Sequence, residues 1–252
     1  MVFPHPVRVE PGGPHGHTYA AVAVRAGDDP EPGAGLPAAL RRIRFTGWLA
    51  PPDSGWLVAV AVPGGGTVAA GRRGIVDVGA WLAAGRPGTV LAIRVLADRQ
   101  LALAGWADGE ELGRYVSDPS REPGADEDVL PEPLGAEYAP AFATACGRPE
   151  MAGDLAVVLA EELDPDSVIE SERLARVLRL LGLPTWVVAV AALPRDVPTG
   201  PRAREMSRLG AGVPGLPGLL CGPVAAVVRR RPPPPVVADP PRGASGIDPW
   251  LL

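Results

Sequence analysis

The sequence predicts an α+β fold, with an antiparallel sheet, a packed layer of helices and disordered ends rich in Pro and Gly. Three observations predict it. Residues 44–62 and 89–117 are rich in β-branched and other apolar residues and contain turn signals that reverse the chain. Residues 134–182 repeat apolar side chains at helical spacing. The 32 Gly and 32 Pro are densest toward the two ends.

The two ends are expected to lie outside the folded domain, which we place at 39–194. The N-terminal arm, 1–38, mixes Pro, Gly and acidic residues around one candidate strand at 19–24, and residues 27–37 have the composition of a linker. In the tail, 195–252, 20 of 58 residues are Gly or Pro. That composition predicts a largely disordered segment.

The first half of the domain is expected to form the sheet. Its strands are predicted at 44–49, 56–62, 89–96, 100–106 and 112–117. The turn-forming residues 51–55 join the first two strands, and apolar spacing predicts a helix over 74–84. Asp108-Gly109 is typical of a tight turn between the last two strands, so 89–117 is expected to be a three-stranded meander.

The second half is expected to form the helical layer. Helices are predicted at 134–146, at 152–163 and over a third segment that ends before Gly182. Ser167 and Glu170 have the spacing of a capping box at the start of this third helix. Residues 185–193 predict a strand or another buried apolar segment.

Composition excludes several functions. The chain has 24 Arg and no Lys, so it has no P-loop lysine, no Schiff-base lysine and no lysine general base. Residues 108–172 hold 18 acidic residues and 3 Arg, a charge that repels phosphate, so we expect no nucleic-acid partner.

The start shows no apolar run of a secretory signal, and no stretch approaches the roughly 20 apolar residues that cross a bilayer. We therefore expect a cytoplasmic protein without membrane contact.

The acidic region favours a non-enzymatic interaction module that binds a basic protein, although a solvated surface without a partner is the simpler interpretation. The candidate partner-binding residues are Trp106, Asp108, Glu110, Glu111, Asp126, Glu127, Asp128 and Trp250. Trp106 ends a strand, where core packing is the default and partner contact is the alternative. Trp250 belongs to an apolar terminal Pro-Trp-Leu-Leu sequence that is suited to docking.

Two other functions stay open. A hydrolase would use carboxylates from 110–111 or from 161–166, with or without a metal ion. A scaffold would act through the tail, where Arg at 229–231 precedes Pro at 232–235 in a run suited to polyproline II recognition.

The remaining reactive side chains do not form an organised motif. His5, His15 and His17 have metal-ligand character, but they lie in a segment without fixed geometry. Cys146 and Cys221 have no His downstream of residue 17 to activate them. We therefore expect no metal and no cofactor.

Two motifs resemble a loose group of uncharacterised proteins from high-GC bacteria. They are ADGEELGRYVSDP at 107–119 and RLARVLRLLGLPTW at 173–186. In that group a DGE-x-x-x-R-Y-x-S-x-P strand leads through an acidic loop to a helical region that ends in LGLP. The match covers residues 45–195, and the resemblance implies no activity and no functional residues. Some of these proteins are similar to small acidic α+β immunity proteins, which implies a bacterial toxin as one form of basic partner.

Overall fold

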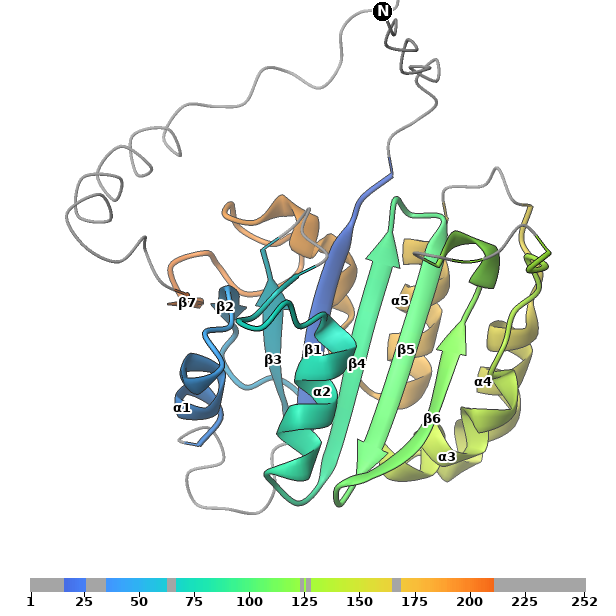
Figure 1. The fold of residues 1–252 in the computed structure, drawn as a ribbon, viewed down its shortest axis with the longest axis horizontal. Helices are drawn as coiled ribbons and strands as arrows, with labels where there is room; N and C mark the ends of the chain where they lie inside the picture. The colour runs from blue at the N-terminus through green and yellow to red at the C-terminus, as the bar shows by residue number, and fades with distance from the viewer. Residues whose placement is uncertain are drawn as a thin grey trace, which may run out of the picture. The chain divides into compact units, whose positions relative to one another are not determined.

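One antiparallel sheet of seven strands organises the chain, in the order β6-β5-β4-β1-β3-β2-β7 (Figure 1). The computed structural model describes residues 16–25, 35–62, 67–122, 125, 128–164 and 169–210. The strands are β1 (Tyr19–Arg25), β2 (Gly47–Leu49), β3 (Trp56–Ala61), β4 (Thr89–Leu96), β5 (Gln100–Ala107), β6 (Glu110–Val116) and β7 (Ser207–Leu209). With the helices described next, this sheet confirms the predicted α+β class.

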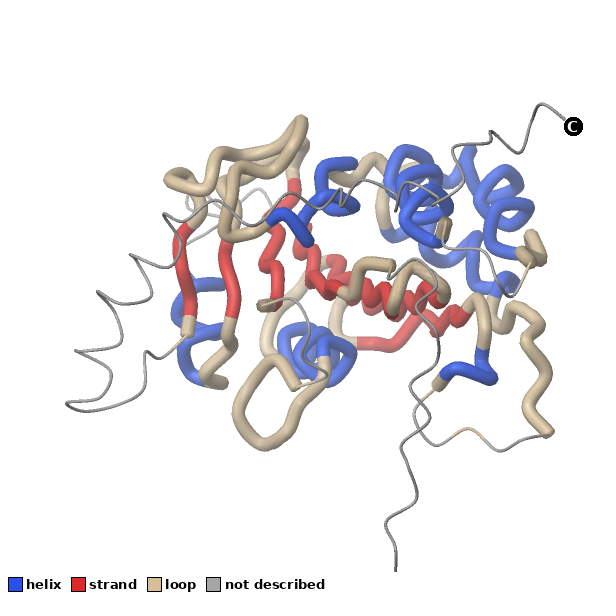
Figure 2. Tube along the Cα trace, turned by 90° about the horizontal axis from the view of Figure 1, so that it is seen from above, coloured by secondary structure: helices blue, strands red, loops and turns tan. Residues whose placement is uncertain are grey.

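Helices pack on both faces of the sheet (Figure 2). One face carries α1 (Gly35–Arg42) and α2 (Ile75–Ala84); the other carries α3 (Ala139–Ala145), α4 (Ala152–Ala160), α5 (Glu170–Leu181) and the 3-10 helix η4 (Thr185–Ala192). Shorter 3-10 helices are η1 (Pro119–Arg121), η2 (Ala136–Tyr138) and η3 (Pro149–Met151). Side chains alternate between the faces, so Val22 packs with α2 whereas Ala21 and Ala23 pack on the side of α5.

Strand β1 is a central strand of the sheet and does not belong to a separate arm. Val22 pairs with Ala59 of β3 on one side and with Ala92 of β4 on the other. Six of the seven residues of β1 are buried, because helices cover both of its faces. The folded part therefore begins before residue 39, and α1 begins at Gly35, inside the predicted linker.

The folded part also extends beyond the predicted boundary at 194. Leu209 of β7 pairs with Gly47 of β2, and Val197 is buried. Residues 195–210 were expected to belong to a disordered tail, and this expectation is wrong because Val197 and Met206 pack in the core with η4, and Leu209 packs in the core on the opposite face of the sheet. Residues 185–193, for which a strand or a buried segment was predicted, form the 3-10 helix η4 up to Ala192, and Trp186, Val187 and Val190 of this helix are buried. The expected disorder of 1–15 and 211–252 lies outside the described residues.

The predicted meander is confirmed as β4-β5-β6. Its last turn uses Asp108 at φ +50° and Gly109 at φ +90°, the left-handed pair that a two-residue hairpin requires. The start of the third helix differs from the prediction. Ile169, and not Ser167, precedes the first turn of α5, and Glu170 lies in the core instead of capping the helix. Ser167 itself lies outside the described residues.

Candidate interaction surface

Strand β6 is an edge of the sheet, and the segment that follows it runs back alongside it. Val116 and Leu134 exchange two backbone hydrogen bonds of 2.9 Å. The ring of Tyr138 lies over Gly113, so close that a Cβ on this glycine would stand 2.2 Å from the ring. This arrangement brings four exposed carboxylates to one edge of the sheet. We call them the acidic edge: Glu110 and Glu111 on β6, and Glu132 and Glu137 on the segment beside it.

Most of the charge on the acidic edge is not neutralised by neighbouring arginines. Glu111 forms a bidentate ion pair with Arg114, with Oε1 2.7 Å from Nε and Oε2 3.0 Å from Nη2. These hydrogen bonds lower the pKa of Glu111. In the described part of the chain, Glu110, Glu132 and Glu137 form no ion pair. Their negative charge therefore faces solvent.

Apolar side chains are exposed beside these carboxylates. Leu130 is 64 % exposed, Leu134 60 % and Tyr138 38 %. We call these three residues the apolar strip. Groups of exposed apolar side chains next to polar ones are common at protein interfaces, whereas a single exposed apolar side chain is normal on any protein surface. Here all three lie within nine residues of sequence on the segment that flanks β6.

The outer edge of β6 also offers backbone groups. Because pairing alternates along a strand, the N–H and C=O of Arg114 point away from β5, as those of Val116 do toward Leu134. The flanking segment covers Arg114, because a Cβ on Gly135 would stand 1.8 Å from the Arg114 carbonyl oxygen. Among the described residues, no backbone hydrogen bond joins the outer side of the start of β6, Glu110 to Leu112, to another segment. An open edge of this kind can pair with a strand from another chain.

The structure exposes some of the predicted interface residues and buries one of them. Asp108 is exposed, but its Oδ1 accepts a hydrogen bond of 2.8 Å from the Gly88 N–H and so fixes the hairpin. Asp128 is exposed. Trp106 is 3 % exposed and packs on Gly79 of α2, which corrects its assignment to the interface because a buried indole offers no surface to a partner. Asp126, Glu127 and Trp250 lie outside the described residues.

Two carboxylates of the hydrolase alternative, Glu111 and Glu161, are paired with arginines. Glu161 Oε2 lies 2.6 Å from Arg176 Nη1, and Glu111 binds Arg114 as described above. The pairing lowers the pKa of Glu111, whereas a general acid needs a raised pKa. The described residues contain no group of three or more His, Cys, Asp or Glu side chains that would hold a metal ion.

A buried polar network joins α5 to the sheet, and sequence patterns did not reveal it. Arg173 of α5 donates hydrogen bonds to the Tyr115 hydroxyl of β6 and to the Glu161 carbonyl, and its Nε lies 3.4 Å from Glu170 Oε2. Nearby, the Tyr19 hydroxyl lies 2.8 Å from Ser171 Oγ. Burial raises the pKa of Tyr115 to about 12. Because these groups are closed to solvent, we assign them a structural role. The sequence feature that could have revealed the network is a pair of charged residues, Glu170 and Arg173, on the buried side of a helix.

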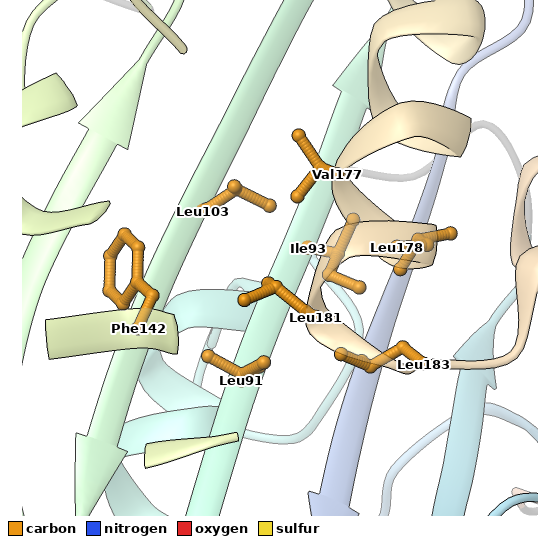
Figure 3. Close-up of a pocket in the computed structure, with 8 residues that line it drawn as sticks. All are labelled: Leu91, Ile93, Leu103, Phe142, Val177, Leu178, Leu181 and Leu183. Carbon is orange, nitrogen blue, oxygen red and sulfur yellow. The ribbon is translucent and has the colours of Figure 1, made fainter. Parts of the chain in front are cut away.

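A small cavity between α5 and the sheet is too small for a ligand. Its volume is about 10 Å³, close to the minimum that holds one water molecule. Its lining is entirely apolar (Figure 3): Leu91, Ile93, Leu103, Phe142, Val177, Leu178, Leu181 and Leu183. It is a gap in core packing.

Comparisons with known proteins returned no match: no family model, no curated protein and no solved structure is similar to this chain. Within the described residues, no helix combines the length and the apolar character needed to span a membrane.

Proposed function

We propose that this protein is a non-enzymatic interaction module that binds a basic protein through the acidic edge. The supporting observation is the coincidence of three features on one edge of the sheet. They are three carboxylates without arginine partners, the exposed apolar strip and the open backbone at the start of β6. Each feature alone is ordinary on a protein surface, whereas together they form the charged rim and apolar centre of an interface.

The sign of the charge selects the partner. Carboxylates steer an Arg- or Lys-rich surface toward the edge and repel a second copy of the same edge. The apolar strip then supplies contact area, and the outer side of β6 supplies backbone hydrogen bonds for an extended segment. A basic bacterial toxin, as immunity proteins bind, is one concrete form of this partner.

A synthetic peptide that alternates Arg and Val tests the proposal. Its affinity is measured by fluorescence anisotropy between about 50 and 500 mM NaCl, a range over which screening shortens from about 14 to 4 Å. The paired substitution Glu110→Gln with Glu137→Gln is expected to weaken binding about fivefold at low salt, with little effect at high salt.

The matched control is Glu162→Gln with Glu172→Gln. It changes the net charge by the same amount, but on the helical layer. We expect this control to change the affinity less than twofold. Equal weakening by both pairs would show that net charge alone attracts the peptide and would overturn the proposal, as would binding that does not change with salt.

A further inference from the structure

Arginines gather at the end of the sheet opposite the acidic edge. Figure 1 shows α1, β2 and β7 at one end of the sheet and β6 at the other. Three described segments meet at the first of these ends: residues 35–50, 67–74 and 207–210. They hold six Arg and no Asp or Glu. Five of these arginines are exposed, and we call them the basic edge: Arg41, Arg42, Arg44, Arg72 and Arg208.

Contacts around Thr46 bring the three segments together. The Thr46 N–H donates a hydrogen bond of 2.8 Å to the Val68 carbonyl. A Cβ on Gly210, at the end of β7, would stand 3.1 Å from the Thr46 Cα. Helix α1 packs beside β7, with Leu40 and Leu209 in the same part of the core. Each arginine of the basic edge lies within five residues of one of these contacts, so the five charges share one region of the surface.

No carboxylate neutralises the basic edge. In the described part of the chain, none of its arginines forms an ion pair. The helix dipole accounts for Arg41 and Arg42, which lie in the last turn of α1. It does not account for Arg72 in a turn or for Arg208 on an edge strand. Their positive charge faces solvent, as the negative charge of the acidic edge does.

The two edges cannot neutralise each other within one molecule. Strands β6 and β7 are the first and the last of the seven, six strand spacings apart. At about 4.8 Å per spacing the separation is about 29 Å, more than three times the Debye length of about 8 Å at physiological ionic strength. The basic edge and the acidic edge therefore attract each other only when two copies meet.

We propose that the basic edge binds the acidic edge of a second copy of this chain. The contact is heterologous because two different edges meet. Each bound copy keeps one free edge, so association continues as an open chain or until a ring closes. Both contact strands also offer backbone groups. Within the described residues β7 pairs only with β2, and the start of β6, Glu110 to Leu112, is open, so strand pairing adds to the ion pairs.

A second copy fits the basic edge better than a nucleic acid does. A nucleic acid is negative along its whole length and is repelled by the rest of a chain whose net charge is −5, whereas a second copy brings its carboxylates to one edge. This inference rests on the proposed function, because it names a second copy as a basic partner of the acidic edge. Self-association then competes with other basic proteins for the same carboxylates.

Sedimentation velocity of the full chain tests the inference. At about 50 mM NaCl the weight-average sedimentation coefficient should rise over about a hundredfold range of protein concentration. At about 500 mM NaCl it should stay at the monomer value, because screening shortens to about 4 Å. Arg42→Glu with Arg208→Glu should weaken self-association at least about tenfold. The same variant should bind the Arg-Val peptide within about twofold of the wild type, since its acidic edge is intact.

An exchange of charges separates a lost contact from a lost fold. Glu110→Arg with Glu137→Arg removes the acidic edge, so this variant alone should not self-associate and should not bind the peptide. Mixed with the Arg42→Glu, Arg208→Glu variant, its intact basic edge should bind the intact acidic edge of the other chain. The mixture should therefore associate, although neither variant does so alone.

The matched control is Arg176→Glu with Arg179→Glu, which changes the net charge as the basic-edge variant does, but on the exposed side of α5. It should change self-association less than about twofold. Equal weakening by this control, or a mixture that does not associate, would overturn the inference. So would a wild type that stays monomeric at low salt, whether or not its basic edge binds duplex DNA. If the monomeric wild type still binds the peptide, this inference fails alone; if the peptide does not bind, the proposed function fails with it.

Discussion

Arg173 and Glu170 form an ion pair that is almost completely closed to solvent. Arg173 Nε lies 3.4 Å from Glu170 Oε2, and the two side chains are 2 % and 4 % exposed. The guanidinium also binds the Tyr115 hydroxyl of β6 and the backbone carbonyl of Glu161 beyond α4. One side chain thus connects the edge strand of the sheet with two helices of the layer behind it.

Removal of Arg173 should therefore destabilise the fold strongly. Arg173→Ala leaves Glu170 buried without a cation and the Tyr115 hydroxyl without its donor, so we expect a loss of about 3–5 kcal/mol. Urea unfolding followed by circular dichroism measures it. Arg176→Ala is the matched control one turn along α5, because its ion pair with Glu161 is about half exposed, and it should cost less than about 1 kcal/mol. Equal losses would contradict a structural role of the buried pair.

The Tyr115 hydroxyl should make stability fall at alkaline pH. Burial raises its pKa from 10.0 to about 12, so the folded state holds the phenolic proton more tightly than the unfolded state does. This contribution is fully present below pH 10 and is lost as the pH rises toward 12. Between pH 9 and pH 11 the wild type should lose about 1.3 kcal/mol relative to Tyr115→Phe, which does not titrate. A constant difference in unfolding free energy between the two proteins would contradict this assignment.

Much of the sheet was predictable from local patterns, whereas its strand order was not. The meander 89–117 carries its own turn at Asp108-Gly109, so neighbours in sequence are neighbours in space. Strand β1 has an equally clear apolar pattern, but its place between β3 and β4 depends on pairing of Val22 with residues 37 and 70 positions away. The Pro, Gly and acidic residues around this strand instead predicted an N-terminal arm outside the folded domain. Strand β7 has three residues, too few for periodicity.

The charged residues on the sheet follow the same division between local pattern and strand order. The exposed carboxylates Glu110 and Glu111 were predicted because a charged turn before a strand is a local feature. Their position at a sheet edge beside Leu134 follows from strand order, which has no local signal. Arg94 is visible as a charge inside an apolar strand, but its relation to Ala102 and Arg114 depends on register.

Gly79 should resist substitution although alanine is the better helix former. A Cβ at this position would lie 2.6 Å from Trp106 Cζ3 and 3.1 Å from Ala92 Cβ, so α2 would have to move away from the sheet. We expect Gly79→Ala to destabilise the protein by about 1–3 kcal/mol. Gly153→Ala on α4, where nothing lies within 4 Å of the new methyl group, should instead stabilise it by about 0.5 kcal/mol. Thermal unfolding of both variants measures these changes in stability. Stabilisation by Gly79→Ala would show that α2 packs less closely on the sheet than these distances indicate.

Cys146 should be inert to thiol reagents while the protein is folded. Burial raises the pKa of its thiol from 9.0 to about 12, although Arg25 opposes the shift. At pH 8 the reactive thiolate is therefore about 1,000-fold scarcer than for an unperturbed thiol, and the reagent must also reach a side chain that is 5 % exposed. In a Cys221→Ser variant, where Cys146 is the remaining thiol, reaction with a chromogenic disulfide should be slow and should accelerate sharply in denaturing urea.

The matched Cys146→Ser variant reports Cys221 by the same assay. Rapid modification of Cys146 without urea would mean that α3 opens readily from the sheet, because neither the buried thiol nor its raised pKa permits fast reaction in the closed fold.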